Sequence, residues 1–228
     1  MALFVIGDLH LSLGADKPMD IFPGWEGYLP RLEANWRKLI SPEDTVVLAG
    51  DTSWAMNLND TKADFAFIQN LPGQKWLLKG NHDYWWTTTR KMDKFLVDSG
   101  FDTLHILHNN ACIIGDTALC GTRGWPFDDA AAQGEKLMAR EAGRLRMSLQ
   151  AAGDAAQRIA FLHYPPIYQG YKCPEMLELL DKYEVERCYY GHLHGYTHRR
   201  VFEGMREKTE YALIAADYVA FQPVKICN

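Results

Sequence analysis

Aspartate, asparagine and histidine residues recur in short glycine-containing motifs along this chain. The motifs are Gly7-Asp8-Leu9-His10, Gly50-Asp51, Gly80-Asn81-His82-Asp83 and Gly191-His192-Leu193-His194, and His163 stands alone. Together they offer seven oxygen or nitrogen donors and no sulfur: Asp8, His10, Asp51, Asn81, His163, His192 and His194. Seven donors are too many for one tetrahedral zinc ion but enough for two ions that share a carboxylate. The sequence therefore predicts a dinuclear metal centre.

The chemical types of these donors limit both the metal and the reaction. Imidazole, carboxylate and amide groups without a thiolate suit Mn²⁺, Fe or Zn²⁺, and we expect two divalent ions with Mn²⁺ as the first choice. Two such ions about 3.5–4 Å apart can activate a bridging hydroxide and hold the attacking and leaving oxygens of a displacement at phosphorus. We therefore expect a small phosphorylated substrate.

The elements that must position these donors are short apolar runs, each of which ends just before one of the polar positions. The runs are Leu3–Ile6, Thr45–Leu48, Lys75–Leu78, Arg158–Leu162 and Arg187–Tyr190. Several apolar residues in a row are typical of strands that are buried on both faces. Ligands bind at the carboxyl ends of strands in α/β sheets, and glycine there permits a tight turn. We therefore expect the donors to meet at one place in the fold.

Each motif taken alone also has an explanation without function. A Gly-Asp pair after a strand is commonly a turn, Asn81-His82-Asp83 can form an Asx-turn, and His163 can be an ordinary loop histidine. Asp8 and His10, two residues apart on one side of an extended backbone, can also cap a turn. The pair His192 and His194 has a spacing that is also found on exposed strands. These explanations would have to hold independently at five strand ends. A shared metal site is therefore the better interpretation.

The remaining pattern predicts the fold. Further strands are expected at Ile113–Ile114 with Ala118–Cys120, Arg199–Phe202, Tyr211–Ala215 and Val224–Cys227. Helical patterns cover Tyr28–Ile40, Thr61–Leu71, Thr87–Ser99 and Glu135–Leu149. Helices and strands alternate up to about residue 100, which predicts parallel βαβ units, whereas the later succession of strands favours a second sheet with antiparallel pairing. We expect one α/β domain over residues 1–228, with two layered sheets flanked by helices.

Composition and charge narrow the classes of function. The chain has 228 residues, of which 47% are hydrophobic and 23% charged, as in an ordinary globular protein. Its 24 Lys and Arg against 29 Asp and Glu give a formal net charge of -5 and no basic stripe, which disfavours nucleic-acid binding. Five cysteines without CxxC spacing indicate free thiols in a reducing compartment. The sequence has neither an apolar run of membrane-spanning length nor a signal-peptide pattern, so we expect a cytoplasmic protein without a membrane partner.

Taken together, the motifs resemble the five-block signature of the calcineurin-like metallophosphoesterases. The blocks run in the expected order from Gly7 to His194 and cover most of the chain. The resemblance implies two packed mixed β-sheets flanked by helices. It also implies that one metal is held by Asp8, His10 and His194. By the same resemblance the other metal is held by Asn81, His163 and His192, and Asp51 bridges the two.

The resemblance implies catalytic roles for two further residues. His82 follows Asn81 directly and would face the substrate, where it stabilises the transition state or protonates the leaving oxygen. Asp83 would accept a hydrogen bond from the other ring nitrogen of His82 and so set its tautomer. The implied reaction is hydrolysis of a phosphomonoester or phosphodiester by a metal-bridging hydroxide. The alternatives are a catalytically silent scaffold of the same fold and a nuclease of the same superfamily.

Three other residues are candidates for binding the substrate. Arg123 follows a strand-like run and could reach a substrate phosphate, although an arginine in a surface turn is the favoured explanation. Trp54 and Trp125 come shortly after strand ends and could form an aromatic wall that stacks on a base or an aryl group. Covering the core is the alternative for both tryptophans.

Overall fold

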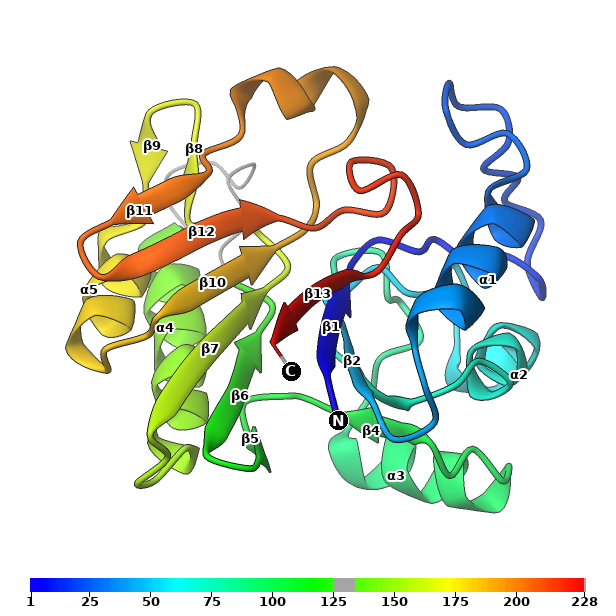
Figure 1. Cartoon of the computed structure of the whole chain (residues 1–228), viewed down its shortest axis with the longest axis horizontal. Coiled ribbons are helices and arrows are strands. Elements are labelled where there is room, and N and C mark those ends of the chain that lie inside the picture. Colours follow the sequence, from blue (N-terminus) through cyan, green and yellow to red (C-terminus); the bar gives the residue numbers. More distant parts are fainter. Residues whose placement is uncertain (125–133, 228) are drawn as a thin grey trace.

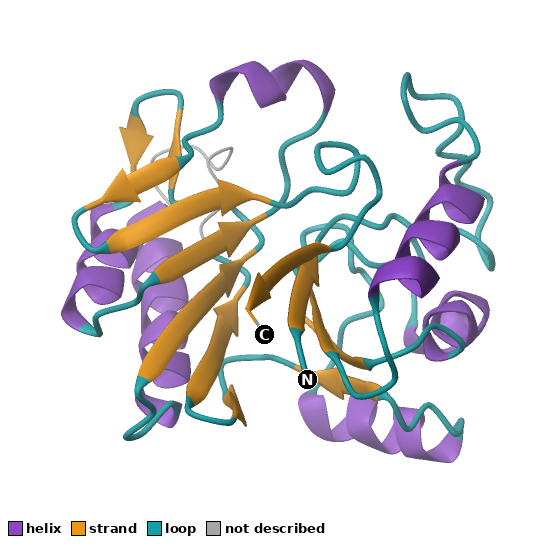
Figure 2. Cartoon of the chain, in the orientation of Figure 1, coloured by secondary structure: helices purple, strands orange, loops and turns teal. Residues whose placement is uncertain are grey.

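Two β-sheets of five and six strands pack against each other, and helices cover their outer faces (Figure 1). The structure, a computed structural model, describes residues 1–124 and 134–227. Figure 2 shows the strands in the middle of the molecule and the long helices at either side. This arrangement confirms the expected α/β fold with two mixed sheets flanked by helices. Within the described ranges, no helix combines the length and apolar composition needed to cross a membrane.

The five-stranded sheet carries the N-terminal motifs. Its order is β13 (Val224–Cys227), β1 (Leu3–Ile6), β2 (Thr45–Leu48), β3 (Gln74–Leu77) and β4 (Leu104–Ile106). Strands β1 to β4 run parallel, and β13 pairs antiparallel with β1. The connections contain α1 (Tyr28–Leu39), the short 3-10 helix η1 (Leu58–Thr61), α2 (Lys62–Gln69) and α3 (Thr89–Asp98). Parallel neighbours need such crossovers, so the alternation predicted for this part of the chain is confirmed.

The six-stranded sheet carries the C-terminal motifs. Its order is β11 (Gly204–Arg206), β12 (Thr209–Leu213), β10 (Arg187–Tyr190), β7 (Gln157–Leu162), β6 (Thr117–Thr122) and β5 (Ala111–Ile114). The four central strands run parallel, so the expected antiparallel pairing occurs only at the two edges of this sheet. Helices α4 (Gly134–Ala151) and α5 (Pro174–Lys182) pack on its outer face. A hairpin of β8 (Ile167–Tyr168) and β9 (Tyr171–Lys172) forms a separate two-stranded sheet.

Alternation of side chains along the strands divides the core into layers. In β1, Leu3 and Val5 belong to the cluster between the sheets, which also contains Phe161 of β7. Phe4 and Ile6 belong to the cluster under the helices of the five-stranded sheet. Because both faces of β1 are buried, an unbroken apolar run encodes it. For the same reason the predicted and observed bounds of β1, β2 and β10 coincide.

Several elements differ from the expectation, among them the strand β4 and the hairpin of β8 and β9, where no strand was predicted. The predicted strand Arg199–Phe202 is wrong, because Gly195–Arg200 forms a 3-10 helix, η2, and β11 begins only at Gly204. Gly195 has a φ of +55°, and the N–H and hydroxyl of Thr197 both donate to the His194 carbonyl, so the chain turns here instead of extending. Helix α5 was not among the predicted elements, and it begins with Pro174, whose missing N–H costs nothing in a first turn.

The two sheets are joined where β1 and β12 end. Gly7 and Ala215 form an isolated parallel bridge. The Gly7 N–H donates to the Ile214 carbonyl (2.8 Å), and the Ala216 N–H donates to the Gly7 carbonyl (3.0 Å). This joint brings the ends of strands from both sheets to the same place, so polar residues that follow those strands can meet.

Candidate metal centre

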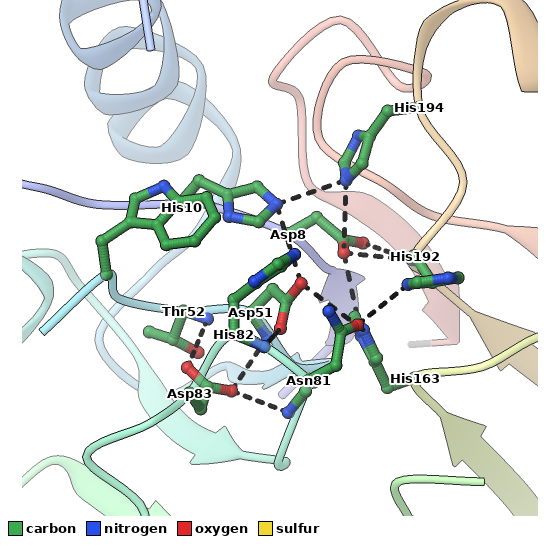
Figure 3. A network of polar contacts seen from close by, with 12 residues as sticks. Asp8, His10, Asp51, Thr52, Asn81, His82, Asp83, His163, His192 and His194 are labelled. Atoms are coloured by element: carbon green, nitrogen blue, oxygen red, sulfur yellow. Dashed lines mark hydrogen bonds and ion pairs between the residues drawn. The ribbon is translucent and has the colours of Figure 1, made fainter. Parts of the chain in front are cut away.

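All seven predicted metal ligands lie together at the carboxyl ends of the strands (Figure 3). The five-stranded sheet supplies Asp8 and His10 after β1, Asp51 after β2 and Asn81 after β3. The six-stranded sheet supplies His163 after β7, and His192 and His194 after β10. Because neither sheet holds the complete set, the site exists only where the two sheets are joined.

The first group of donors, which we term the His194 set, consists of Asp8, His10 and His194. The Nε2 atoms of His10 and His194 are 3.3 Å apart, and His194 Nε2 is 3.6 Å from Asp8 Oδ1. Ligands bound to one ion at about 2.1 Å in tetrahedral geometry stand about 3.4 Å from one another. The spacing of these three donors therefore fits one shared cation.

The second group, the His163 set, consists of Asn81, His163 and His192. Asn81 Oδ1 lies 2.6 Å from His163 Nε2 and 2.9 Å from His192 Nδ1. Asp51 lies between the two sets, because its Oδ2 is 3.5 Å from His163 Nε2 and 3.8 Å from His10 Nε2. One carboxylate oxygen thus faces both sets, which is the position that a bridging ligand needs.

The charge of this site calls for a cation. Asp8, Asp51 and the adjacent Asp83 are each at most 1% exposed. Burial raises the pKa of the Asp51 carboxyl well above its usual range, and the nearby Asp83 and Asp8 raise it further. Buried carboxylates are costly unless they are paired or coordinate a metal. The buried Asp and His cluster is therefore consistent with a metal site.

Two of the histidines are oriented by acceptors behind them. His163 Nδ1 lies 3.2 Å from the Ala49 carbonyl oxygen, and His194 Nδ1 lies 2.8 Å from Asp217 Oδ1. Donation from Nδ1 leaves Nε2 with a lone pair that can bind a metal. Burial lowers the pKa of His163 to about 3. Burial also opposes protonation of His194, but hydrogen bonds to Asp217 and Asp8 raise its pKa to about 10.

The backbone is strained where several of the donors attach. Asp8, His10, Asp51 and His192 have φ values of +58°, +47°, +49° and +73°. These values lie in the left-handed region that residues other than glycine rarely adopt. Such conformations persist only where the surrounding structure fixes them, and they gather at functional sites. Four of the seven predicted ligands therefore share this conformation, which six other non-glycine residues of the described chain also adopt.

Glycines in the motifs allow two carboxylates to approach the backbone closely. A Cβ atom on Gly80 would overlap the Asp51 carboxylate, and one on Gly191 would overlap the Asp8 carboxylate. In the same region, the His192 N–H donates to both oxygens of Asp8 at 3.0 Å. These glycines are therefore needed for close approach.

His82 stands outside both sets. Its backbone N–H donates to Asp51 Oδ1 (2.7 Å), and its ring Nδ1 is 3.2 Å from the Tyr84 hydroxyl. Burial lowers the pKa of the ring. The side chain lines a cavity together with His10 and His194. His82 is therefore placed where a group bound at the metal ligands could reach it.

The prediction that Asp83 accepts a hydrogen bond from the His82 ring is wrong. The two Asp83 oxygens instead accept from four backbone N–H groups and one indole N–H, those of Asp51, Thr52, Ser53, Gly80 and Trp85. This carboxylate therefore ties the loop after β2 to the loop after β3. Its task is to hold Asp51 and Asn81 in place, and it has no contact that would set the tautomer of His82.

The structure describes two of the three expected substrate-binding residues, Trp54 and Arg123. Both adjoin predicted ligands, Arg123 through its backbone carbonyl, which accepts from the His163 N–H at 3.0 Å. The Trp54 ring stacks on the His10 ring, with centroids 5.0 Å apart. The Arg123 guanidinium instead lies 3.5 Å from the buried Glu141 carboxylate. Trp125 lies outside the described residues. Trp54 thus stays a candidate for contacting substrate, whereas Arg123 has an intramolecular partner.

Asp217 is a site residue that the sequence patterns missed. Besides His194, it contacts the Gly195 N–H (3.1 Å from Oδ2) and His198 Nε2 (3.4 Å from Oδ2). Asp217 comes shortly after β12, just as the other site residues follow β1, β2, β3, β7 and β10. The same strand-end signal therefore marks it.

Three solved structures share this fold over nearly the whole chain. A protein of unknown function from Aquifex aeolicus is 17% identical with a TM-score of 0.52, over 98% of this chain and 95% of its own. The phosphopantetheinyl hydrolase of Mycobacterium tuberculosis is 14% identical with a TM-score of 0.60, over 99% and 95%. A protein from Thermus thermophilus is 10% identical with a TM-score of 0.60, over 99% and 97%. At these identities the likeness shows the fold alone.

The sequence itself identifies the family. No curated protein matches the sequence of this chain. The family model of the calcineurin-like phosphoesterases matches residues 1–196, a range that contains both ligand sets, Asp51 and His82. The match agrees with the two-sheet fold and with the buried Asp and His cluster between the sheets. The chain belongs to the calcineurin-like phosphoesterase family.

Proposed function

We propose that the protein is a dinuclear metal-dependent phosphoesterase that hydrolyses a small phosphomonoester or phosphodiester. The observation that carries the proposal is the position of Asp51 Oδ2, which is 3.8 Å from His10 Nε2 and 3.5 Å from His163 Nε2. Two divalent cations, Mn²⁺ first and Fe or Zn²⁺ as alternatives, would polarise the phosphoryl oxygens and supply an activated water. The donor chemistry of both sets fits such ions.

The protein's own groups have separate tasks in this proposal. The two ligand sets and Asp51 would hold the cations that fix the position of the phosphoryl group. Asp83 keeps the loops of Asp51 and Asn81 in fixed relation, so that little reorganisation is needed during reaction. His82 gives a proton to the leaving oxygen as the bond to phosphorus breaks. Its imidazole lines the cavity at the site and is not engaged by Asp83.

The two alternatives have less support. A silent scaffold would be favoured by the loss of a ligand or of His82, and each of these residues is present. A nuclease needs a basic surface for its substrate, which a net charge of -5 without a basic stripe does not favour. A scaffold without catalysis gives no reason for His82 to lie beside the seven donors, and the nuclease, which would use the same donors, is disfavoured by charge alone.

The test is a metal titration with two substrates. Metal-stripped protein is titrated with Mn²⁺, and hydrolysis of p-nitrophenyl phosphate and of bis-p-nitrophenyl phosphate is followed beside the bound metal. We expect two ions per chain and turnover that appears with them. The ratio of the two rates distinguishes a monoesterase from a diesterase. The same titration is carried out on Asp51→Asn, which removes the charge shared by the two sets. Asp98→Asn, on the exposed face of α3, is the matched control.

The opposing outcomes are distinct. Two bound ions without turnover of either ester would favour the scaffold. Cleavage of a single-stranded DNA oligomer at a higher rate than either ester would favour the nuclease. Absence of bound Mn²⁺, Fe and Zn²⁺ would contradict the metal centre itself.

A further inference from the structure

An apolar cavity opens directly beside the predicted metal ligands. It has a volume of about 500 Å³, and one side of it is formed by His10, His82 and His194. The first and last of these belong to the His194 set, and His82 is the residue proposed to protonate the leaving oxygen. A substrate whose phosphoryl group lies at the metal ligands would therefore place a neighbouring group in this cavity.

An apolar wall makes up most of the remaining lining. It is formed by Met19, Phe22, Trp25, Trp54 and Tyr196. Met19 and Trp25 are 8% and 3% exposed and belong to the core, so this wall is fixed. Phe22 and Tyr196 are 49% and 80% exposed at the same cavity. A bound group would cover apolar surface that otherwise faces water.

Two of the polar groups at the cavity, the Trp54 indole and the Asp217 carboxylate, already have partners. The Trp54 indole N–H donates to Met19 Sδ at 3.3 Å. Asp217, the charged carboxylate among the described lining residues, is bonded to the His194 ring at 2.8 Å. A sugar hydroxyl or a nucleobase edge in this cavity would therefore give up hydrogen bonds to water and find few replacements. An aryl or alkyl group would lose nothing of this kind.

We propose that this cavity binds the alcohol portion of the substrate and that this portion is apolar, an aryl or alkyl group. The inference rests on the proposed function, because the metal centre is taken to hold the phosphoryl group. The substrate R–O–PO₃²⁻ reacts with water to give R–OH and hydrogen phosphate. The water oxygen bonds to phosphorus, the bond between phosphorus and the ester oxygen breaks, and that oxygen receives its proton from His82.

The position of His82 assigns the cavity to the leaving group. Its ring packs against Trp54 with centroids 4.4 Å apart, so proton donor and apolar wall adjoin. Trp54 also stacks on His10, which links the wall to the His194 set. The alkoxide that His82 protonates must therefore carry its R group along Trp54.

The first experiment measures binding without turnover. Dissociation constants of methyl-, propyl- and hexylphosphonate for the Mn²⁺-loaded protein are measured by calorimetry, since these compounds have no ester bond to cleave. Burial of a methylene group predicts a tightening of about two- to fourfold for each added carbon. We expect 2,3-dihydroxypropylphosphonate to bind about 10- to 100-fold more weakly than propylphosphonate. Equal affinities along the series, preference for the hydroxylated compound, or no binding at all would each overturn the proposal.

The second experiment places the effect in the cavity. We expect Phe22→Ser and Tyr196→Ser to reduce the ratio of hexyl- to methylphosphonate affinity about three- to tenfold, and Phe22→Leu to restore most of it. Ile113→Ser is the matched control, because Ile113 is 52% exposed on β5 and does not line this cavity. A ratio that responds equally to the control, or to none of the variants, would overturn the proposal.

Turnover separates this inference from the proposed function. The corresponding n-alkyl phosphates have leaving groups of nearly equal basicity, so their rates report chain length alone. Hydrolysis at rates that do not depend on chain length, with equal phosphonate affinities, would overturn the cavity assignment and leave a phosphoesterase. Affinity that rises with chain length, without hydrolysis of any ester, would contradict the phosphoesterase and leave an apolar phosphoryl-ligand site.

Discussion

The two ligand sets are held by the chain in different ways. In the His194 set, the histidine is backed by the carboxylate of Asp217 and is 31% exposed at the cavity. In the His163 set, His163 is backed by the neutral carbonyl of Ala49 and is fully buried. The His194 set also contains the carboxylate Asp8, whereas the His163 set contains the neutral amide Asn81.

This difference has a consequence for the metals. A carboxylate behind a ligand histidine raises the basicity of the imidazole and fixes its orientation. The His194 set therefore combines more negative charge with an open side toward substrate. The His163 set carries less charge, and within it His163 is fully buried whereas Asn81 and His192 are half-buried. We expect the first divalent ion to bind the His194 set and the second to bind the His163 set more weakly.

The largest effect is expected from the residue that both sets share. Asp51→Asn should remove the bridging charge, leave less than one tightly bound ion per chain and reduce phosphoesterase turnover about 1,000-fold or more. Elemental analysis after dialysis and a Mn²⁺-dependent rate assay measure the two losses. Asp98→Asn should change neither. Two retained ions in Asp51→Asn would contradict the bridging position.

The next effect should leave the metals untouched. His82→Ala should retain two ions, because His82 belongs to neither set. Loss of the proton donor should slow hydrolysis of alkyl phosphates about 10²–10⁴-fold, and of p-nitrophenyl phosphate much less, because p-nitrophenolate departs without a proton. His105→Ala, on β4, is the control. Equal slowing of both substrates together with metal loss would argue for a structural role.

A smaller effect should fall on one set alone. Asp217→Asn keeps the shape of the side chain but removes the charge behind His194, so the affinity of the tighter site for Mn²⁺ should fall about 10- to 100-fold. A Mn²⁺ titration that has two phases in the unaltered protein should approach one phase. Asp181→Asn, which breaks a surface pair with Arg206, should preserve both phases. If Asp217→Asn instead weakened the lower-affinity phase of the Mn²⁺ titration, the His194 set would be the weaker of the two sites.

The smallest effect is the pH dependence of the metal-free protein. Burial lowers the pKa of His163 and His192 to about 3, below their unfolded value of about 6.5. The unfolded chain therefore binds more protons between these values, and the free energy of unfolding should fall as the pH drops through this window. For His194, hydrogen bonds to Asp217 and Asp8 outweigh burial and raise the pKa to about 10. The contribution of His194 to the free energy of unfolding should therefore be lost as the pH rises from about 6.5 to 10.

Denaturant titrations across these pH values measure both slopes. Each proton contributes at most about 1.4 kcal/mol per pH unit. His163→Gln should reduce the pH dependence of the free energy of unfolding only below about pH 6.5. His194→Gln should reduce it only above that pH. If either variant changed the pH dependence in the other pH range, the two sets would not differ as described.

The residues found from the sequence share a local signal. Asp8, Asp51 and His163 each follow a buried strand closely, so an apolar run and the polar residue after it are enough to find them. The same signal continues to Asp217 after β12, but there the spacing no longer matched a motif. Where the backbone itself decides the structure, as at Gly195, the β-like composition of Arg199–Phe202 predicted a strand that does not form.

Partners that are distant in sequence could not be found in this way. Asp83 is next to His82 in the chain, yet it bonds to the loop after β2, because that loop offers several free N–H groups in the fold. The apolar cavity combines Phe22, Trp54 and Tyr196 from three separate segments. No periodicity or motif connects these residues, since Phe22 and Trp54 lie in irregular connections and Tyr196 lies in the short 3-10 helix η2.

The sequence by itself determined the family, most strands of the two sheets and the types of metal donor, because each of these is recognised from short runs of neighbouring residues. The tertiary structure alone decided that Asp51 faces both ligand sets, that Asp217 stands behind His194, and that an apolar wall adjoins His82. These relations arise where β1 and β12 join the two sheets through the Gly7–Ala215 bridge. They depend on the packing of segments that are separated in the chain, by 23 residues for His194 and Asp217 and by about 200 for Gly7 and Ala215, and local patterns carry no information on such packing.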